Sequence, residues 1–279
     1  MRTFIITLRK YATSYGFLIC IGMAVMLLFS SEVYYDYDTQ TRYSVFSTLM
    51  DFTFEERCAR FELCSSSVLK SAQGTWFTLF APIIAAFCFV PTICTEREEK
   101  AARFQIFRTT RLNYCVSQFF AAVFAGGIAI MLGYSIFAAA SLMLFPDISQ
   151  MSEFAAEVLQ GTTINIPMLI LKEFLFGAFW SVPAMFLTSV LNNKYLIMCI
   201  PFFLKYGLMQ TYQKISQNAF SLDGVDEHAR KLANAINPDG ILWIYDETRL
   251  TVSLVFGISA AVMFAAFIII NRKRGDCGA

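Results

Sequence analysis

The apolar run Val116–Phe145, VSQFFAAVFAGGIAIMLGYSIFAAASLMLF, decides the class of fold because it contains no Asp, Glu, Lys or Arg. A helix needs about 20 predominantly apolar residues to cross the hydrocarbon core of a bilayer. We therefore predict a transmembrane helix in this run. Since the run is longer than one crossing requires, we expect its Phe145 end to tilt or to leave the hydrocarbon.

The whole composition favours a lipid environment. The chain of 279 residues is 57% hydrophobic and 15% charged, with a mean hydropathy of +0.55. Ordinary soluble domains have about 45–50% apolar and about 25% charged residues. We predict an all-α membrane protein, a single domain over residues 1–279, with six transmembrane helices that leave no room for a large soluble domain. The five other predicted spans are Phe17–Ser31, Trp76–Cys94, Pro167–Leu191, Tyr195–Tyr212 and Thr251–Asn271.

The distribution of Lys and Arg predicts the orientation. Basic residues are dense in alternate connections, and such connections lie on the cytoplasmic side. Both termini are then expected inside the cell. The net charge of +1 gives no reason to expect nucleic acid as a partner. The basic residues of the dense side are Arg2, Arg9, Lys10, Arg97, Lys100, Arg103, Arg108, Arg111, Lys194, Arg272, Lys273 and Arg274.

The segment before the first span has the periodicity of an amphipathic helix. Its apolar residues recur at helical spacing, and Arg9 and Lys10 take the opposite face. We interpret it as a helix lying in the inner interface of the membrane. The alternative is a simple anchor with a basic end. The apolar face consists of Phe4, Ile5, Leu8, Tyr11, Ala12 and Tyr15.

The two long outer loops carry three further expectations. Cys58 and Cys64 share the first loop on the oxidising side, so we predict a disulfide between them, with two free thiols as the alternative. The other cysteines lack the paired spacing of a zinc site, and no metal is expected. The last loop predicts a helix over Asp223–Ala235, ended by the turn Asn237–Gly240.

Three charged residues fall inside predicted spans: Lys172, Glu173 and Lys205. Charge at membrane depth is costly, so each should be paired or face a cavity. At 1.5 Å per residue, Glu173 and Lys205 come within roughly 5 Å of each other in depth. We predict that they pair across the fourth and fifth spans. In the alternative interpretation, Lys172 extends to the interface and Glu173 occupies a shallow wet pocket.

The inner segment after the second span, Thr95–Arg111, reads TEREEKAARFQIFRTTR. It predicts a short cytoplasmic helix with an acidic start and a basic end. On spacing alone, a solvated loop that follows the positive-inside rule is the favoured interpretation.

This segment, directly after the second of six spans, resembles the membrane subunits of type-2 ABC exporters. The resemblance implies a coupling helix that docks on an ATPase, and the amphipathic start resembles the connecting helix of that family. Family members often have Gly after the acidic run, where this chain has Lys100 and Ala101, so the local turn departs from the family pattern. The resemblance assigns ATPase coupling to Glu96, Arg97, Glu98, Glu99, Phe104, Phe107, Arg108 and Arg111.

The same resemblance implies the partners. The chain has no G-x-x-x-x-G-K-[ST] motif, so ATP and Mg²⁺ belong on a separate ABC ATPase subunit. A second permease subunit, identical or a sister chain, should complete the pathway in the plasma membrane, which we expect to be bacterial. No cofactor and no catalytic residue are expected in this chain. Because the spans are rich in Phe, Met and Leu, we expect a hydrophobic or amphipathic cargo, such as a peptide, a lipid-like compound or a drug.

Two other function classes remain open from sequence. Glu98–Arg103, EEKAAR, matches the Glu-Glu-x-x-x-Arg motif of CAAX-protease-like intramembrane proteases. That chemistry also needs histidines at membrane depth, whereas the single histidine, His228, falls in an outer loop across the bilayer. The other class is a membrane scaffold or sensor subunit that transports nothing.

Overall fold

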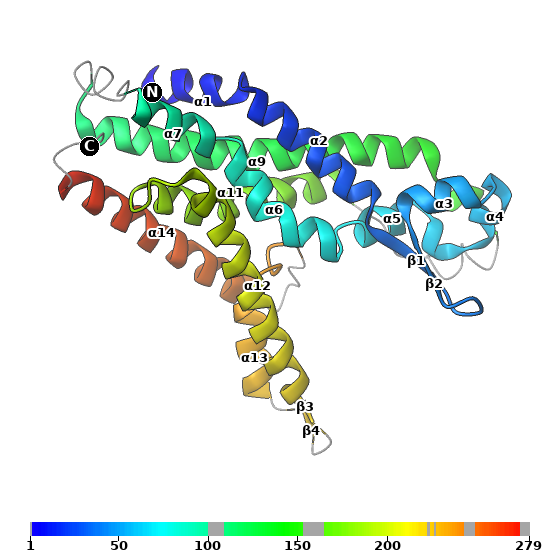
Figure 1. The fold of residues 1–279 in the computed structure, drawn as a ribbon. Coiled ribbons are helices and arrows are strands. Elements are labelled where there is room, and N and C mark those ends of the chain that lie inside the picture. The colour runs from blue at the N-terminus through cyan, green and yellow to red at the C-terminus, as the bar shows by residue number, and fades with distance from the viewer. Residues whose placement is uncertain are drawn as a thin grey trace.

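The computed structural model describes residues 2–99, 109–152, 165–221, 224–225, 227–242 and 249–273. These residues are mostly helical, with two short antiparallel hairpins. The first turn of α1 (Arg2–Ala12) and the last turn of α14 (Arg249–Lys273) lie at one end of the molecule, which we call the terminal end, beside the last turn of α7 (Val90–Glu98) and the first turn of α9 (Arg111–Leu144) (Figure 1). The first hairpin lies at the opposite end of α9, and α12 and α13 project away from the main body.

Most helices follow the predicted segments, with two differences. The helix predicted over Asp223–Ala235 begins at Glu227, after a strand at Gly224–Val225, and the second predicted span divides into two helices, Thr75–Phe87 and Val90–Glu98. In chain order, the α-helices are α1 (Arg2–Ala12), α2 (Tyr15–Phe29), α3 (Val45–Asp51), α4 (Phe54–Ala59), α5 (Ser65–Ser71), α6 (Thr75–Phe87), α7 (Val90–Glu98), α9 (Arg111–Leu144), α11 (Ile166–Thr188), α12 (Lys194–Ala219), α13 (Glu227–Ile236) and α14 (Arg249–Lys273). The 3₁₀ turns are Phe61–Leu63 and Ile148–Gln150, and the strands are β1 (Glu32–Asp36), β2 (Thr41–Ser44), β3 (Phe220–Ser221) and β4 (Gly224–Val225).

Four helical stretches of the described chain are long and apolar enough to cross a membrane: Trp76–Glu98, Arg111–Gln150, Ile166–Thr188 and Val252–Arg272. A fifth span is possible if α1 and α2, which meet at 60°, count together. The predicted fifth span forms α12, a continuous helix, yet α12 is not among these candidates. All six predicted spans thus correspond to helical segments. Four of them, or five if α1 and α2 form one span, are long and apolar enough to cross a membrane.

The bend between α1 and α2 has a local cause. Ser14 caps α2 by accepting a hydrogen bond from the Phe17 amide at 3.3 Å, and its hydroxyl donates to the carbonyl of Tyr11 at 2.7 Å. Such side-chain caps end one helix and begin the next. The predicted N-terminal helix is therefore a separate element, α1, and its buried Tyr11 fixes it to the body of the protein.

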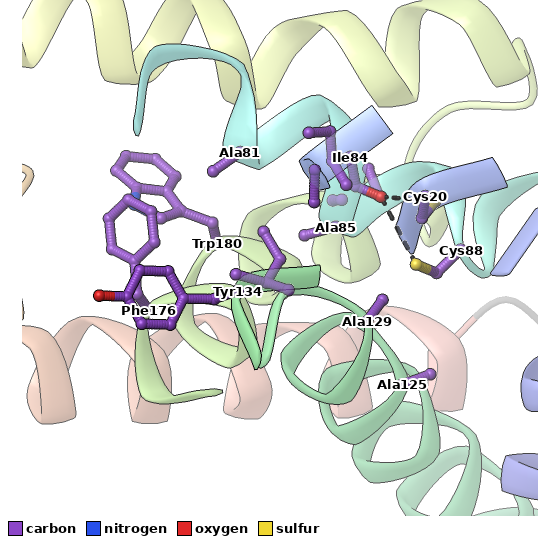
Figure 2. Packing of buried hydrophobic residues seen from close by; sticks show 14 of the residues in the cluster. Cys20, Ala81, Ile84, Ala85, Cys88, Ala125, Ala129, Tyr134, Phe176 and Trp180 are labelled. Carbon is purple, nitrogen blue, oxygen red and sulfur yellow. Dashed lines mark hydrogen bonds between the residues drawn. The ribbon is translucent and has the colours of Figure 1, made fainter. Parts of the chain in front are cut away.

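Small residues let α9 and α11 cross closely. A Cβ atom on Gly177 would lie 2.9 Å from the carbonyl oxygen of Gly126 and 2.9 Å from Cβ of Ile130. Close backbone approach of this kind is typical of membrane helix pairs. Alanines continue the pattern between α6 and α9, beside the Ile84 carbonyl, which accepts hydrogen bonds from Cys20 and Cys88 (Figure 2).

The segment between α2 and α6 folds into a cap at the hairpin end, where the sequence predicted only a loop. Strands β1 and β2 pair in antiparallel register, with Tyr35 opposite Arg42. Arg60 lies over the ring of Phe52 at 4.1 Å and over that of Tyr34 at 5.2 Å, and these cation–π contacts hold the short helices against the hairpin. An all-α description therefore needs this hairpin as a correction.

Two carboxyls of this cap have lowered pKa values. A side-chain hydrogen bond from Thr39 lowers the pKa of Asp36. The backbone amide of Thr53, 2.7 Å from Oε2 of Glu56, lowers the pKa of Glu56 within the capping box of α4. Both hydrogen bonds favour the charged form of the acid.

Candidate functional site

At the terminal end, an ion pair joins the N-terminal helix to the helix that precedes the predicted coupling segment. Nζ of Lys10 in α1 donates to Oε1 of Glu96 in α7. Only 6% of Glu96 is exposed, so this pair is shielded from water on the side of the carboxylate. Breaking such a pair by removing one partner would leave a buried charge uncompensated. The contact therefore fixes α1 relative to α7.

Two arginines at the same end connect further helices. Arg97 donates to the backbone carbonyl of Thr188, the last residue of α11, and Arg111 donates to the carbonyl of Asn271 in α14. Carbonyls at a helix C-terminus carry partial negative charge and attract cations. A cavity of about 10 Å³, enough for about one water molecule, lies between these contacts. Its lining is Ile93, Glu96, Arg97, Tyr114, Cys115, Gln118 and Asn271.

The predicted coupling residues divide into three groups. Glu96, Arg97 and Arg111 belong to the internal contacts just described. Glu98 and Glu99, at the end of α7, are exposed. Phe104, Phe107 and Arg108 lie outside the described residues. The acidic start of the segment therefore combines one buried structural carboxylate with two that are free to meet a partner.

The second polar site is a cluster formed by Gln73, Glu173, Lys205 and Asp239, which we call the buried charge cluster. Glu173 and Lys205 are fully buried, and 2% of Gln73 is exposed. Nε2 of Gln73 donates to Oε1 of Glu173 at 2.8 Å. Nζ of Lys205 lies 2.7 Å from Oδ1 of Asp239. The cluster thus joins α11 and α12 to the start of α6 and to the turn before α14.

This arrangement corrects the predicted ion pair. Lys205 pairs with Asp239, and Glu173 receives its hydrogen bond from Gln73 instead of from Lys205. Lys205 also donates to the carbonyl of Thr78, and its Nζ lies 4.6 Å from the centre of the Phe176 ring. The depth argument correctly placed both charges in one region, but it considered only charges inside spans and so missed Asp239.

The turn Asn237–Gly240 forms as predicted and is held by two lysines. Gly240 donates its amide to the Asn237 carbonyl at 3.0 Å, which closes the turn. Asp239 meets Lys205 of α12, and Lys172 of α11 donates to the Leu242 carbonyl at 3.2 Å. Lys172 therefore has a partner inside the protein. The turn, which follows α13 in the chain, therefore contacts both α11 and α12 near the buried charge cluster.

Sequence reasoning missed Gln73 and Asp239 as members of this site. Gln73 precedes Gly74, just before the second predicted span, and Asp239 was explained by its turn. Their only signal was position, because each is a polar residue shortly before an apolar run. Pairing between loops and spans is not visible from helical periodicity.

The predicted disulfide is not formed. Cys58 and Cys64 are free thiols, and Cys64 is buried against Met151 and Ile148. The carbonyl of Cys58 instead accepts a hydrogen bond from the Ser152 amide at 3.2 Å. Contacts with the segment after α9, rather than a covalent link, therefore hold this loop.

Within the described residues, no group of three or more His, Cys, Asp or Glu side chains could hold a metal ion. His228 lies on α13, far from Glu98 and Glu99 at the terminal end (Figure 1). Comparisons with protein-family models, with curated proteins and with solved structures found no match. The functional argument therefore rests on the two polar sites.

Proposed function

We propose that this chain is the membrane subunit of an ATP-driven exporter of the type-2 ABC class. In this proposal it crosses the plasma membrane six times, with both termini in the cytoplasm. The observation that carries the proposal is the ion pair between Lys10 and Glu96. It fixes the N-terminal helix to the exact point where the expected coupling segment begins, so force applied to that segment reaches two spans together.

The exposed carboxylates support a docking role for the same end. Glu98 and Glu99 extend from α7 into solvent, while Glu96 and Arg97 keep the base of the helix in place. A rigid base with an exposed charged tip suits contact with a separate ATPase, which would hold ATP and Mg²⁺. Charges at a rim chiefly steer and orient such a partner.

The buried charge cluster supports six spans rather than five. Helix α12 is the least apolar of the predicted spans, and Lys205 is its main obstacle to crossing a bilayer. Asp239 neutralises that lysine inside the protein, which lowers the cost of a charge at membrane depth. The exposed apolar face of α14 is then available to lipid or to a second permease subunit. Its most exposed large residues are Leu254, Ile258, Val262 and Ile269.

The cargo in this proposal is hydrophobic or amphipathic. The exposed side chains of α2 and α12 are largely apolar, and they would face lipid or a pathway between two subunits. The fixed charges along them are Lys194 at the start of α12, the neutralised Lys205, and the exposed Lys214 towards its C-terminal end. Such a surface suits a lipid-like compound, an apolar peptide or a drug better than a sugar or an ion.

The test is affinity purification of the tagged full-length protein from membranes of its own cells, followed by mass spectrometry. The wild-type protein should co-purify with a polypeptide that contains a P-loop, and the sample should hydrolyse ATP. Glu98→Lys together with Glu99→Lys should lose this polypeptide while expression is unchanged. Glu96 is left intact, because its reversal would also break the contact with Lys10.

The matched control applies the same charge change at the opposite end of the molecule. Asp51→Lys with Glu55→Lys alters two exposed carboxylates in α3 and α4 and should leave co-purification unchanged. Absence of any P-loop polypeptide from the wild-type sample would overturn the exporter proposal and favour a scaffold. Equal loss in both double variants would overturn the assignment of the coupling site.

A further inference from the structure

We infer that Glu173 is a proton-binding site whose carboxyl group carries a proton in the arrangement described. The basis is the charge balance of the buried charge cluster, which holds one cation and two carboxyl groups. A charge at membrane depth is costly unless it is paired or neutralised. The inference concerns ion binding and does not depend on whether the chain is an exporter.

Lys205 has the surroundings of a charged ammonium group. An ammonium has three N–H donors, and Lys205 has three complementary neighbours. Nζ contacts Oδ1 of Asp239 at 2.7 Å, donates to the Thr78 carbonyl, and lies 4.6 Å from the centre of the Phe176 ring. The carboxylate and the ring face attract a cation electrostatically, and they attract a neutral amine far less. The single positive charge of the cluster is therefore on Lys205.

Asp239 is the counter-ion of that charge. It lies in direct contact with Lys205, and 17% of its side chain is exposed, so water also stabilises its negative form. With this pair formed, the positive charge of the cluster is used. Any charge on Glu173 would be a net negative charge.

Glu173 has no such compensation. Its side chain is fully buried, Oε1 accepts one hydrogen bond from neutral Gln73, and Oε2 has no hydrogen-bond partner among the described residues. An isolated carboxylate in an apolar interior costs far more free energy than its protonated form. A proton on this carboxyl group removes the excess charge.

The charged and titratable groups nearest to Glu173 point elsewhere. Lys172, the preceding residue, donates to the Leu242 carbonyl, and the hydroxyl of Tyr134 in α9 donates to the Leu69 carbonyl at 3.0 Å. The charged ends of α7 and α9 lie near Thr188, roughly 22 Å further along α11 at 1.5 Å per residue. Arg249, at the start of α14, has a side chain outside the described part.

A proton fits this site better than a larger cation. Within the described residues, no group of three or more His, Cys, Asp or Glu side chains could hold a metal ion, and the Glu173 side chain is fully buried. A metal ion or an organic cation would need space and several ligands, whereas a proton from water needs only one oxygen atom. The carboxylate takes its proton from a hydronium ion: an O–H bond of hydronium breaks, an O–H bond forms on the carboxyl group, and water is released.

The test uses infrared spectroscopy of the full-length protein in lipid nanodiscs, titrated from about pH 5 to about pH 9, the range reached by buried carboxyls. The wild-type protein should show the carbonyl band of a protonated carboxyl group near neutral pH. Glu173→Gln, which keeps the shape of the protonated acid, should lose this band. The control Glu55→Gln, an exposed carboxylate of α4, should keep it.

Two further variants test the charge balance itself. Asp239→Asn leaves Lys205 free to neutralise Glu173, so the band should appear only at lower pH than in the wild type. Lys205→Met removes the cation, so the band should persist to higher pH. These opposite shifts distinguish charge balance from a merely buried carboxyl group. A wild-type spectrum identical to that of Glu173→Gln over the whole titration would overturn the inference, as would shifts in the same direction for both variants.

Discussion

The ion pair between Lys205 and Asp239 predicts a large energetic coupling that a double-mutant cycle can measure. Lys205 is fully buried and 17% of the Asp239 side chain is exposed, so the lysine pays the greater desolvation cost. Removing one partner of a buried ion pair typically costs about 3–5 kcal/mol of unfolding free energy. Because Asp239 can gain water, we expect Lys205→Met to cost about 3 kcal/mol.

Where Glu173 stays protonated, Asp239→Asn should cost a similar amount, because the buried ammonium loses its charged partner and keeps the Thr78 carbonyl and the Phe176 and Trp180 rings. Replacing both charges by apolar groups is often nearly neutral. The double variant Lys205→Met with Asp239→Asn removes both charges and should therefore be no less stable than either single variant. With each single variant costing about 3 kcal/mol, the coupling free energy is at least about 3 kcal/mol, measured by reversible unfolding in mixed micelles.

The control cycle uses Lys231 and Glu227, an exposed i,i+4 pair on α13 with Nζ and Oε1 2.9 Å apart. Exposed pairs of this kind contribute about 0.5 kcal/mol or less. Strictly additive losses at Lys205 and Asp239, equal in coupling to the control, would refute the argument that the pair is a buried structural element.

Three other predictions follow from the described contacts. Gly177→Ala should destabilise the protein by about 1–3 kcal/mol, because its Cβ would overlap the Gly126 carbonyl and Ile130. The control Gly207→Ala, with no atom within 4 Å of the new Cβ, should not destabilise it. Thermal unfolding in detergent compares the two variants, and equal melting temperatures would contradict the close crossing. Mass spectrometry of the proteolytic peptide that contains residues 58–64 should show the same mass with and without reductant, since Cys58 and Cys64 are free thiols. A mass lower by two hydrogens without reductant would show that the disulfide forms. The lowered pKa of Glu56 means that its contribution to stability is present above the pKa of the unfolded chain and is lost as pH falls through the folded value. The protection factors of α4 amides against hydrogen exchange should therefore fall in acid for the wild type but not for Glu56→Gln, which retains a capping side chain. An equal fall in both proteins would exclude this carboxyl as the cause.

Much of the helical framework could be predicted because it depends on local properties of the chain. Apolar runs long enough to cross a bilayer gave all six helical segments, and the pair Asn237 and Pro238 gave the turn that follows α13. The same reasoning missed the hairpin of β1 and β2. Its strands carry Tyr residues that also fit an aromatic belt at a membrane surface, so composition alone could not distinguish the two.

The candidate sites were predictable only as far as each residue could be interpreted alone. The sequence identified Lys205 and Glu173 as costly charges, and their depth along two helices placed them in the same region. The choice of partner depends on tertiary contacts across more than 30 positions of sequence, which bring Asp239 under Lys205 and Gln73 against Glu173. Neither partner belongs to a span, so a search confined to spans could not find them.

The two polar sites differ in their access to water, and this difference gives them separate roles in the proposed exporter. The terminal-end contacts combine buried groups such as Glu96 with partly exposed ones such as Lys10, which has 45% of its side chain exposed, so a soluble partner can reach them from one side. The buried charge cluster has almost no access to water, and its arrangement can change only if charge is moved or neutralised. Under the inference above, ionisation of Glu173 is such a change of charge. It would attract Lys205 away from Asp239 and weaken the contact between α12 and the turn Asn237–Gly240. The sites therefore offer one contact that a soluble partner can act on and one that the ion balance of the membrane interior can act on.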